Sequence, residues 1–80
     1  MTRFEYTYSL EYYANQAFIQ TPILQNRDIL EVYLDGVGRS EIVSAGTPVD
    51  QQVKYEASGK ITFPSVLELG TKIVVLYQNL

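Results

Sequence analysis

The sequence predicts an all-β fold, a small antiparallel β-sandwich or barrel of about six or seven short strands. Three observations lead to this prediction. Apolar and polar side chains alternate in several segments, turn-forming residues recur about every 8 to 12 positions, and no linker, repeat or low-complexity segment interrupts the pattern. A chain of 80 residues has room for one domain, so we predict a single domain over residues 1–80.

The first predicted strand covers residues 3–13. Its apolar residues alternate strictly with polar ones and therefore share one face of a half-buried strand: Phe4, Tyr6, Tyr8, Leu10 and Tyr12. A helix over residues 10–19 is the alternative, because Ser9 could cap it and five residues follow helical spacing: Leu10, Tyr13, Ala14, Ala17 and Phe18. We prefer the strand, since the alternation runs the full length of the segment and neighbouring tyrosines are poor helix formers.

Residues 17–24 form the second predicted strand, which Pro22 ends because proline cannot donate a hydrogen bond to a neighbouring strand. The third strand alternates again, with Leu30, Val32 and Leu34 on one face and a second set on the other: Ile29, Glu31, Tyr33 and Asp35. Asp35-Gly36 is a dipeptide that a two-residue type I′ turn prefers. Gly38 offers a second permissive position, so a longer loop or a bulge is the alternative.

The second half of the chain begins with residues 40–50, which are expected to form a short strand followed by a loop. Residues 52–57 and 60–63 then alternate on either side of Ser58-Gly59. Two alternating segments joined through a glycine are typical of a β-hairpin. The sequence therefore predicts a hairpin with a tight turn at Ser58-Gly59.

The last predicted strand, residues 71–78, follows a loop that turns at Gly70 and is apolar on both faces. Val74 and Leu76 face away from the set that would enter the core: Ile73, Val75 and Tyr77. If no strand of the same chain covers Val74 and Leu76, they form an apolar stripe on a sheet with an open edge, which favours association with another subunit. We therefore predict that Val74 and Leu76 lie at a protein-protein interface.

Tyrosine is the one residue type in excess, with seven in the chain. Tyr13 and Tyr33 are out of phase with the residues that would form the core, whereas the others alternate with them. Amphipathic rings outside a core are favoured at contact surfaces. Tyr13 and Tyr33 are therefore either singly exposed, which is normal for a surface residue, or members of the predicted interface, to which we add them.

The composition argues against catalysis and metal binding. The chain has no histidine and no cysteine, so it lacks the groups that most often titrate or attack near neutral pH and the commonest zinc ligands. A carboxylate pair is the remaining route, but Glu31 and Asp35 stand roughly 13 Å apart on a strand that rises ~3.3 Å per residue. We therefore predict no enzyme activity, no cofactor and no metal.

Charge and hydropathy also restrict the partners. Six Lys and Arg residues against nine Asp and Glu give a net charge of -3, and the basic residues are scattered rather than gathered on one stripe, as phosphate binding requires. No apolar run approaches the ~18 residues of a membrane span, and the first residues lack the apolar region of a signal peptide. The sequence predicts a soluble, unexported chain that binds neither nucleic acid nor membranes.

Six motifs follow one another over residues 29–78: Glu31-Val-Tyr-Leu-Asp-Gly36, Val53-Lys-Tyr55, Ser58-Gly59, Lys60-Ile-Thr-Phe63, Leu69-Gly70 and Ile73-Val-Val-Leu-Tyr77. This order resembles a β-sandwich module that recurs in structural proteins of tailed bacteriophages, including tail-fibre attachment regions and head fibres. The resemblance covers about 50 of the 80 residues, and residues 1–24 match no motif of it.

The resemblance implies a virion structural protein without an active site, first of all a head-fibre or capsid-decoration component and next a tail part. It implies other virion proteins as partners, a location in the virion and assembly in the host cytoplasm. It also implies a homo-oligomer, since trimers are common among fibre-like members. The alternative function is an adhesive or carbohydrate-binding module, in which Tyr33 or Tyr13 stacks on a sugar.

Overall fold

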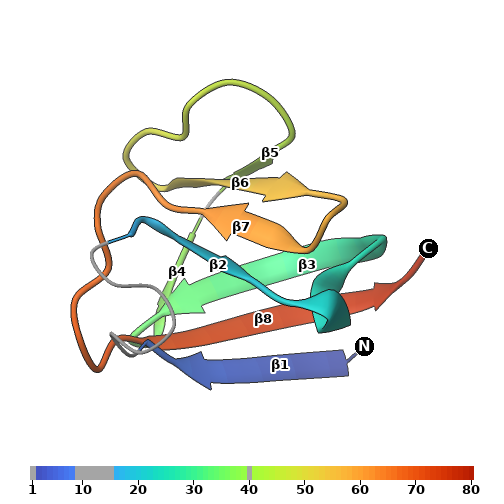
Figure 1. Cartoon of the computed structure of the whole chain (residues 1–80), viewed down its shortest axis with the longest axis horizontal. Coiled ribbons are helices and arrows are strands. Elements are labelled where there is room, and N and C mark those ends of the chain that lie inside the picture. The colour runs from blue at the N-terminus through green and yellow to red at the C-terminus, as the bar shows by residue number, and fades with distance from the viewer. Residues whose placement is uncertain (1, 9–15, 40) are drawn as a thin grey trace.

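The computed structural model describes residues 2–8, 16–39 and 41–80, most of which form strands. Two four-stranded sheets lie face to face (Figure 1). Sheet 1 contains, in spatial order, β1 (Thr2–Thr7), β8 (Lys72–Asn79), β3 (Arg27–Leu34) and β4 (Val37–Gly38). Sheet 2 contains β2 (Phe18–Gln20), β7 (Lys60–Thr62), β6 (Gln52–Glu56) and β5 (Glu41–Val43). The predicted all-β sandwich is confirmed.

The described residues contain eight strands, where the pattern predicted six or seven, because the residues after the Asp35-Gly36 turn add the two-residue strand β4. Strands pair antiparallel throughout sheet 1. In sheet 2 one pair, β5 and β6, runs parallel. The loop of residues 44–51 carries the chain back to the end at which β5 began, as a parallel pair requires, so sheet 2 is mixed.

The core lies between the two sheets and draws apolar side chains from both. Among the described residues, eleven hydrophobic side chains are buried: Tyr8, Ile19, Leu24, Val32, Val53, Ile61, Phe63, Leu67, Ile73, Val75 and Tyr77. No polar or charged side chain of the described residues is buried. The half-buried Tyr55 links the layers, because its hydroxyl donates to the Leu24 carbonyl at 2.5 Å and accepts from Arg27 N–H at 3.0 Å.

Strand β1 follows the predicted alternation as far as the structure describes it. Its polar residues are exposed, its aromatic residues Phe4 and Tyr6 are half-buried, and Tyr8, directly after the strand, is buried. Residues 9–15 lie outside the described residues, and with them Tyr13 and most of the alternative helix over residues 10–19. At the end of that segment, Phe18 and Ile19 belong to β2, a strand.

The predicted strand over residues 17–24 is shorter in the structure. β2 ends early, and a 3-10 turn, η1 (Pro22–Leu24), takes the place of its second half. A proline at the first position of a turn loses no hydrogen bond by lacking an N–H, and the Thr21 hydroxyl accepts one from Ile23 N–H at 3.3 Å. The turn buries Leu24 completely, so the prediction is wrong in the second half of this segment.

Strand β3 contains a bulge that the alternation does not reveal. The register with β8 shifts between Ile29 and Glu31, which makes Leu30 the extra residue. As a result, Ile29 packs against the core and Leu30 is 37% exposed, whereas the sequence predicted the reverse. After the bulge, Val32 and Leu34 face the core as predicted.

The predicted turns occur where the sequence placed them. Asp35 and Gly36 both have positive φ angles, 50° and 84°, and they join β3 to β4 as a type I′ turn. Gly59, with φ 91°, follows Ser58 and closes the β6–β7 hairpin. Gly70, with φ 89°, turns the loop ahead of β8.

Candidate interaction surface

The outer face of sheet 1 carries the predicted interface residues. Strand β8 lies between β1 and β3, and its register sets two rows across this face: Glu5, Val74 and Tyr33 in one, Arg3, Leu76 and Glu31 in the other. Val74 and Leu76 therefore occupy the centre, with Tyr33 beside Val74. The structure brings these three predicted residues together, whereas Tyr13 lies outside the described residues.

Val74 and Leu76 are half-buried, although no described strand covers them. Alternation along β8 explains their direction, because the residues between and beside them fill the core: Ile73, Val75 and Tyr77. Paired residues on neighbouring strands stand ~4.5–5.5 Å apart at Cβ. The side chains of β1 and β3 therefore form a rim around a small apolar centre.

The rim is held together by ion pairs and one hydrogen bond. Arg3 and Lys72 lie 2.8 and 2.9 Å from the Glu5 carboxylate, and the Tyr33 hydroxyl donates to Glu31 at 2.7 Å. The hydrogen bond from Lys72, with a further contribution from Arg3, lowers the pKa of Glu5 below its ordinary 4.5. The hydrogen bond to Glu31 raises the pKa of Tyr33 above 10.0, because it favours the protonated phenol.

The ring of Tyr33 also packs against the neighbouring edge strand β4. It pairs with Gly38, and a Cβ added there would lie 3.2 Å from the Tyr33 Cε1 atom. An aromatic ring beside an edge glycine helps to fix strand register. Gly38 thus makes room for Tyr33 and does not lengthen the turn, which was the alternative that the sequence left open.

Sequence reasoning missed the rim. Its charged members look like ordinary polar residues of alternating strands: Arg3, Glu5, Glu31 and Lys72. Their period-two positions placed each on an outward face, and this signal was available. The strand order β1-β8-β3 was not, and only that order gathers them around Val74 and Leu76.

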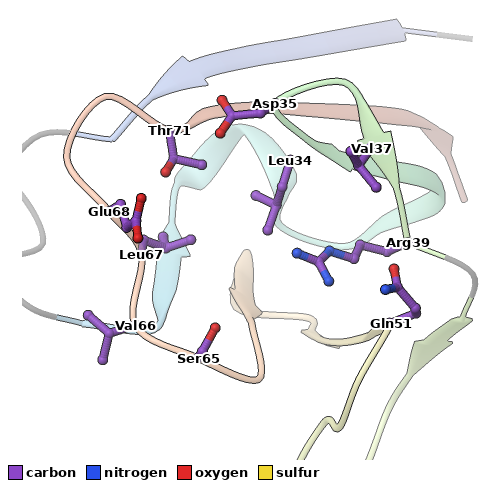
Figure 2. A pocket seen from close by; sticks show the side chains of 10 residues that line it. All are labelled: Leu34, Asp35, Val37, Arg39, Gln51, Ser65, Val66, Leu67, Glu68 and Thr71. Carbon is purple, nitrogen blue, oxygen red and sulfur yellow. The ribbon is translucent and has the colours of Figure 1, made fainter.

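A second feature is an open hollow beside the β3–β4 turn, with a volume of about 370 Å³. Its lining mixes apolar and polar side chains: Leu34, Asp35, Val37, Arg39, Gln51, Ser65, Val66, Leu67, Glu68 and Thr71. Figure 2 shows the Arg39 side chain reaching into the middle of this hollow, below Leu34. Arg39 donates through Nη1 to the Asp50 carbonyl at 3.3 Å, while its buried Nε has no hydrogen-bond partner among the described residues.

The polar groups of the hollow serve the surrounding loops. The Asp35 carboxylate accepts a hydrogen bond from Lys72 N–H at 2.8 Å and so ties the β3–β4 turn to β8. The Arg39 guanidinium holds the loop at Asp50. Among the described residues, no group of three or more potential metal ligands is present. The outer face of sheet 1, where the predicted residues gather, is therefore the stronger candidate site.

Comparison with known proteins gives no match, since neither a protein-family model, nor a curated protein, nor a solved structure is significantly similar to the chain. Within the part of the chain that the structure describes, no helix is long and apolar enough to cross a membrane.

Proposed function

We propose that the protein is a non-enzymatic assembly component that docks another protein on the outer face of sheet 1. The observation that supports this most directly is the pair Val74 and Leu76, two apolar side chains at the centre of a sheet face that no described strand covers. An apolar centre with a charged rim is the common anatomy of a protein interface. The molecule spans 31 × 23 × 23 Å, so one face is close to the ~800 Å² that a standard interface takes from each partner.

The setting we infer is the virion of a tailed bacteriophage, where the chain would be a head-fibre or capsid-decoration protein, with a tail part as the next option. Support comes from the resemblance over residues 29–78. Its motifs correspond to β3, to the turn at Gly36, to the β6–β7 hairpin, to the turn at Gly70 and to β8. In this setting other virion structural proteins are the partners, and the protein works by position rather than by chemistry.

Two leucine-to-lysine variants test the docking face. Leu76→Lys places a charge in the centre of the face, where it is costly once a partner removes water, so we expect a folded chain that no longer joins particles. Leu69→Lys is the matched control, because Leu69 is 67% exposed in the loop before β8 and should join normally. Mass spectrometry of purified particles counts each chain. Normal incorporation of Leu76→Lys, or absence of the wild-type chain from particles, contradicts the proposal.

The alternative, an adhesive or carbohydrate-binding module, has one observation in its favour. Tyr33 is held by its hydrogen bond to Glu31 and by the space at Gly38, and a ring fixed in this way suits stacking on a sugar. A glycan array separates the two functions. Binding that disappears in Tyr33→Ala and persists in Tyr33→Phe, which keeps the ring, would favour the carbohydrate-binding module.

A further inference from the structure

Strand β1 is the long open edge of the sandwich. It pairs with β8 on one side, and no described strand lies on its other side (Figure 1). The other edge strands are short, with two residues in β4 and three each in β2 and β5. β1 has six residues, TRFEYT, without proline, glycine or a bulge. It therefore lacks most of the features that protect an edge strand from pairing with another chain.

We infer that β1 pairs antiparallel with β1 of a second copy of this chain, about a two-fold axis that is perpendicular to sheet 1 and passes midway between the Phe4 residues of the two copies. The four-stranded sheets of the two copies then join into one continuous sheet. This inference rests on the proposed function in one respect, namely that the protein acts through contacts with other chains. It names one such partner and the strand that binds it.

The backbone of β1 is positioned for this pairing. Along an antiparallel strand, residues alternate between bonding one neighbour and facing the other side. Tyr8 N–H donates to Thr71 at 2.8 Å, which directs the even-numbered residues toward β8. Asp35 N–H donates to the Lys72 carbonyl at 2.8 Å, so the backbone groups of Lys72 point toward β3. Thr7 is paired with Lys72 on β1, and its backbone groups therefore point away from β8. Both observations indicate that the odd-numbered residues of β1 direct their amide and carbonyl groups to the open side. These residues are Arg3, Glu5 and Thr7.

The charges of β1 select one register. A two-fold axis perpendicular to the sheet keeps outward side chains outward, so odd-numbered residues must lie opposite odd-numbered ones. With the axis at Phe4, Arg3 of each copy lies opposite Glu5 of the other. These are also the residues whose backbone groups face the open side, so each charged pair coincides with a pair of backbone hydrogen bonds. The two Phe4 side chains meet on the core-facing side.

The neighbouring registers are disfavoured by repulsion. An axis at Glu5 would set two glutamates opposite each other, and an axis at Arg3 would set two arginines opposite each other. Like charges directly opposite destabilise strand pairing. At Phe4, by contrast, each Glu5 carboxylate keeps Arg3 of its own chain at 2.8 Å and gains Arg3 of the second copy.

The pairing has a consequence for the docking face. Because the axis is perpendicular to sheet 1, Val74 and Leu76 of both copies face the same direction on one continuous sheet. A dimer therefore presents two docking surfaces side by side to a larger particle. Two linked surfaces bind more tightly than one when both can engage at once.

Charge variants of the full chain test the inference by sedimentation equilibrium at concentrations up to about 1 mM. We expect the wild-type chain to dimerise, and Arg3→Glu and Glu5→Arg each to weaken dimerisation by about tenfold or more, because each sets like charges opposite one another twice. An equimolar mixture of the two variants should restore dimerisation, since every charged position then faces its opposite in the other copy. A purely structural effect on one chain would not be rescued by mixing.

Two controls separate the edge from other surfaces. Glu41→Arg makes the same charge change on the exposed edge strand β5 of sheet 2 and should leave dimerisation unchanged. Tyr33→Lys changes the docking face on β3, which β8 separates from β1, and should change dimerisation by less than about twofold. Failure of the edge pairing and failure of the docking proposal are therefore seen in different variants.

Amide hydrogen exchange gives a readout at single residues. The amides of Arg3 and Glu5 should become protected as the protein concentration rises, because only the second copy bonds them. Phe4 and Tyr6 face β8 and should be protected at every concentration. A wild-type chain that stays monomeric at about 1 mM, or a variant mixture that does not recover, overturns the inference.

Discussion

The two sheets share one core but differ in what they present to the outside. Sheet 1 has two strands of eight residues and carries Val74 and Leu76 in the middle of its outer face. Sheet 2 has strands of three to five residues, and Phe18, on its outer side, has the Lys60 ammonium 4.4 Å from the ring centroid. Its other outward side chains on β6 and β7 are polar: Gln52, Lys54, Glu56, Lys60 and Thr62. Core packing explains both inner faces but not the apolar centre on the outer face of sheet 1, which the proposed docking of a partner would explain.

If the core is shared equally, the inner faces should respond alike to lost packing. Ile73 in sheet 1 and Ile61 in sheet 2 are both fully buried. Replacing either with alanine should lower the free energy of unfolding by about 2 to 5 kcal/mol. Denaturant unfolding followed by tyrosine fluorescence measures both variants. A difference between them of more than about 2 kcal/mol would show that one sheet contributes much less to the core.

The glycine turns should differ more than the cores. A Cβ at Gly59 in sheet 2 would lie 2.1 Å from the Thr21 carbonyl oxygen, whereas a Cβ at Gly36 in sheet 1 would meet nothing within 4 Å. Both positions have positive φ. We expect Gly36→Ala to cost about 1 kcal/mol of unfolding free energy from backbone strain alone and Gly59→Ala to cost about 2 kcal/mol or more.

Thermal unfolding of the two variants side by side measures this difference. The reason for it is that the β6–β7 hairpin packs against the segment between β2 and η1, whereas the β3–β4 turn projects into solvent. Equal losses in the two variants would mean that the Thr21 segment moves away from Gly59 without cost.

The sequence was informative wherever the determinant of structure is local. Alternation in β1 and in β8, and the dipeptides Asp35-Gly36 and Ser58-Gly59, each fix a strand or a turn within a few residues. Local patterns failed where one extra residue entered a strand. The bulge at Leu30 exchanges the faces of Ile29 and Leu30, and nothing in the alternation marks it.

The candidate interaction surface was predictable in part. Val74 and Leu76 could be named because alternation along one strand shows that both of its faces are apolar. The charged rim depends on which strands neighbour β8 and on their register, which residues far apart in the sequence decide together. Glu5 and Glu31, for example, meet the same strand from opposite sides. The open edge at β1 could be recognised only from the strand order.

The hydrogen bond between Tyr33 and Glu31 in the rim of sheet 1 should be measurable in the titration of the Tyr33 phenol. Its hydrogen bond to Glu31 raises the pKa of the phenol above 10.0. Glu31→Gln should lower that pKa toward 10.0, and ultraviolet absorbance, with Tyr33→Phe as the reference that removes the signal, measures the change. Since the folded-state pKa is raised, this contribution to stability is complete below the unfolded-state value and is lost as the pH rises through the folded-state value. An unchanged pKa in Glu31→Gln would mean that the hydrogen bond is not formed in solution.

The smallest expected effect concerns Glu5, which takes part in both ion pairs found among the described residues, Arg3–Glu5 and Lys72–Glu5, both on sheet 1. The hydrogen bond from Lys72 is the main reason that the pKa of Glu5 lies below 4.5, and Arg3 adds to it. Lys72→Met should therefore raise the pKa of Glu5 toward 4.5, as measured by NMR titration of its carboxyl carbon in dilute, monomeric protein. A pKa that stays low in Lys72→Met would mean that Arg3 alone holds the carboxylate.

The same variant should change the pH dependence of stability in a defined direction. A carboxyl group whose pKa is lowered by folding stabilises the folded chain above the unfolded-state value, here 4.5, and that contribution is lost as the pH falls through the folded-state value. Lys72→Met should therefore flatten the decline of the unfolding free energy below pH 4.5. The groups are exposed, so the effect should be small and should shrink further as added salt screens the pair. A decline that is as steep in Lys72→Met as in the wild-type chain would show that acid sensitivity arises outside the rim.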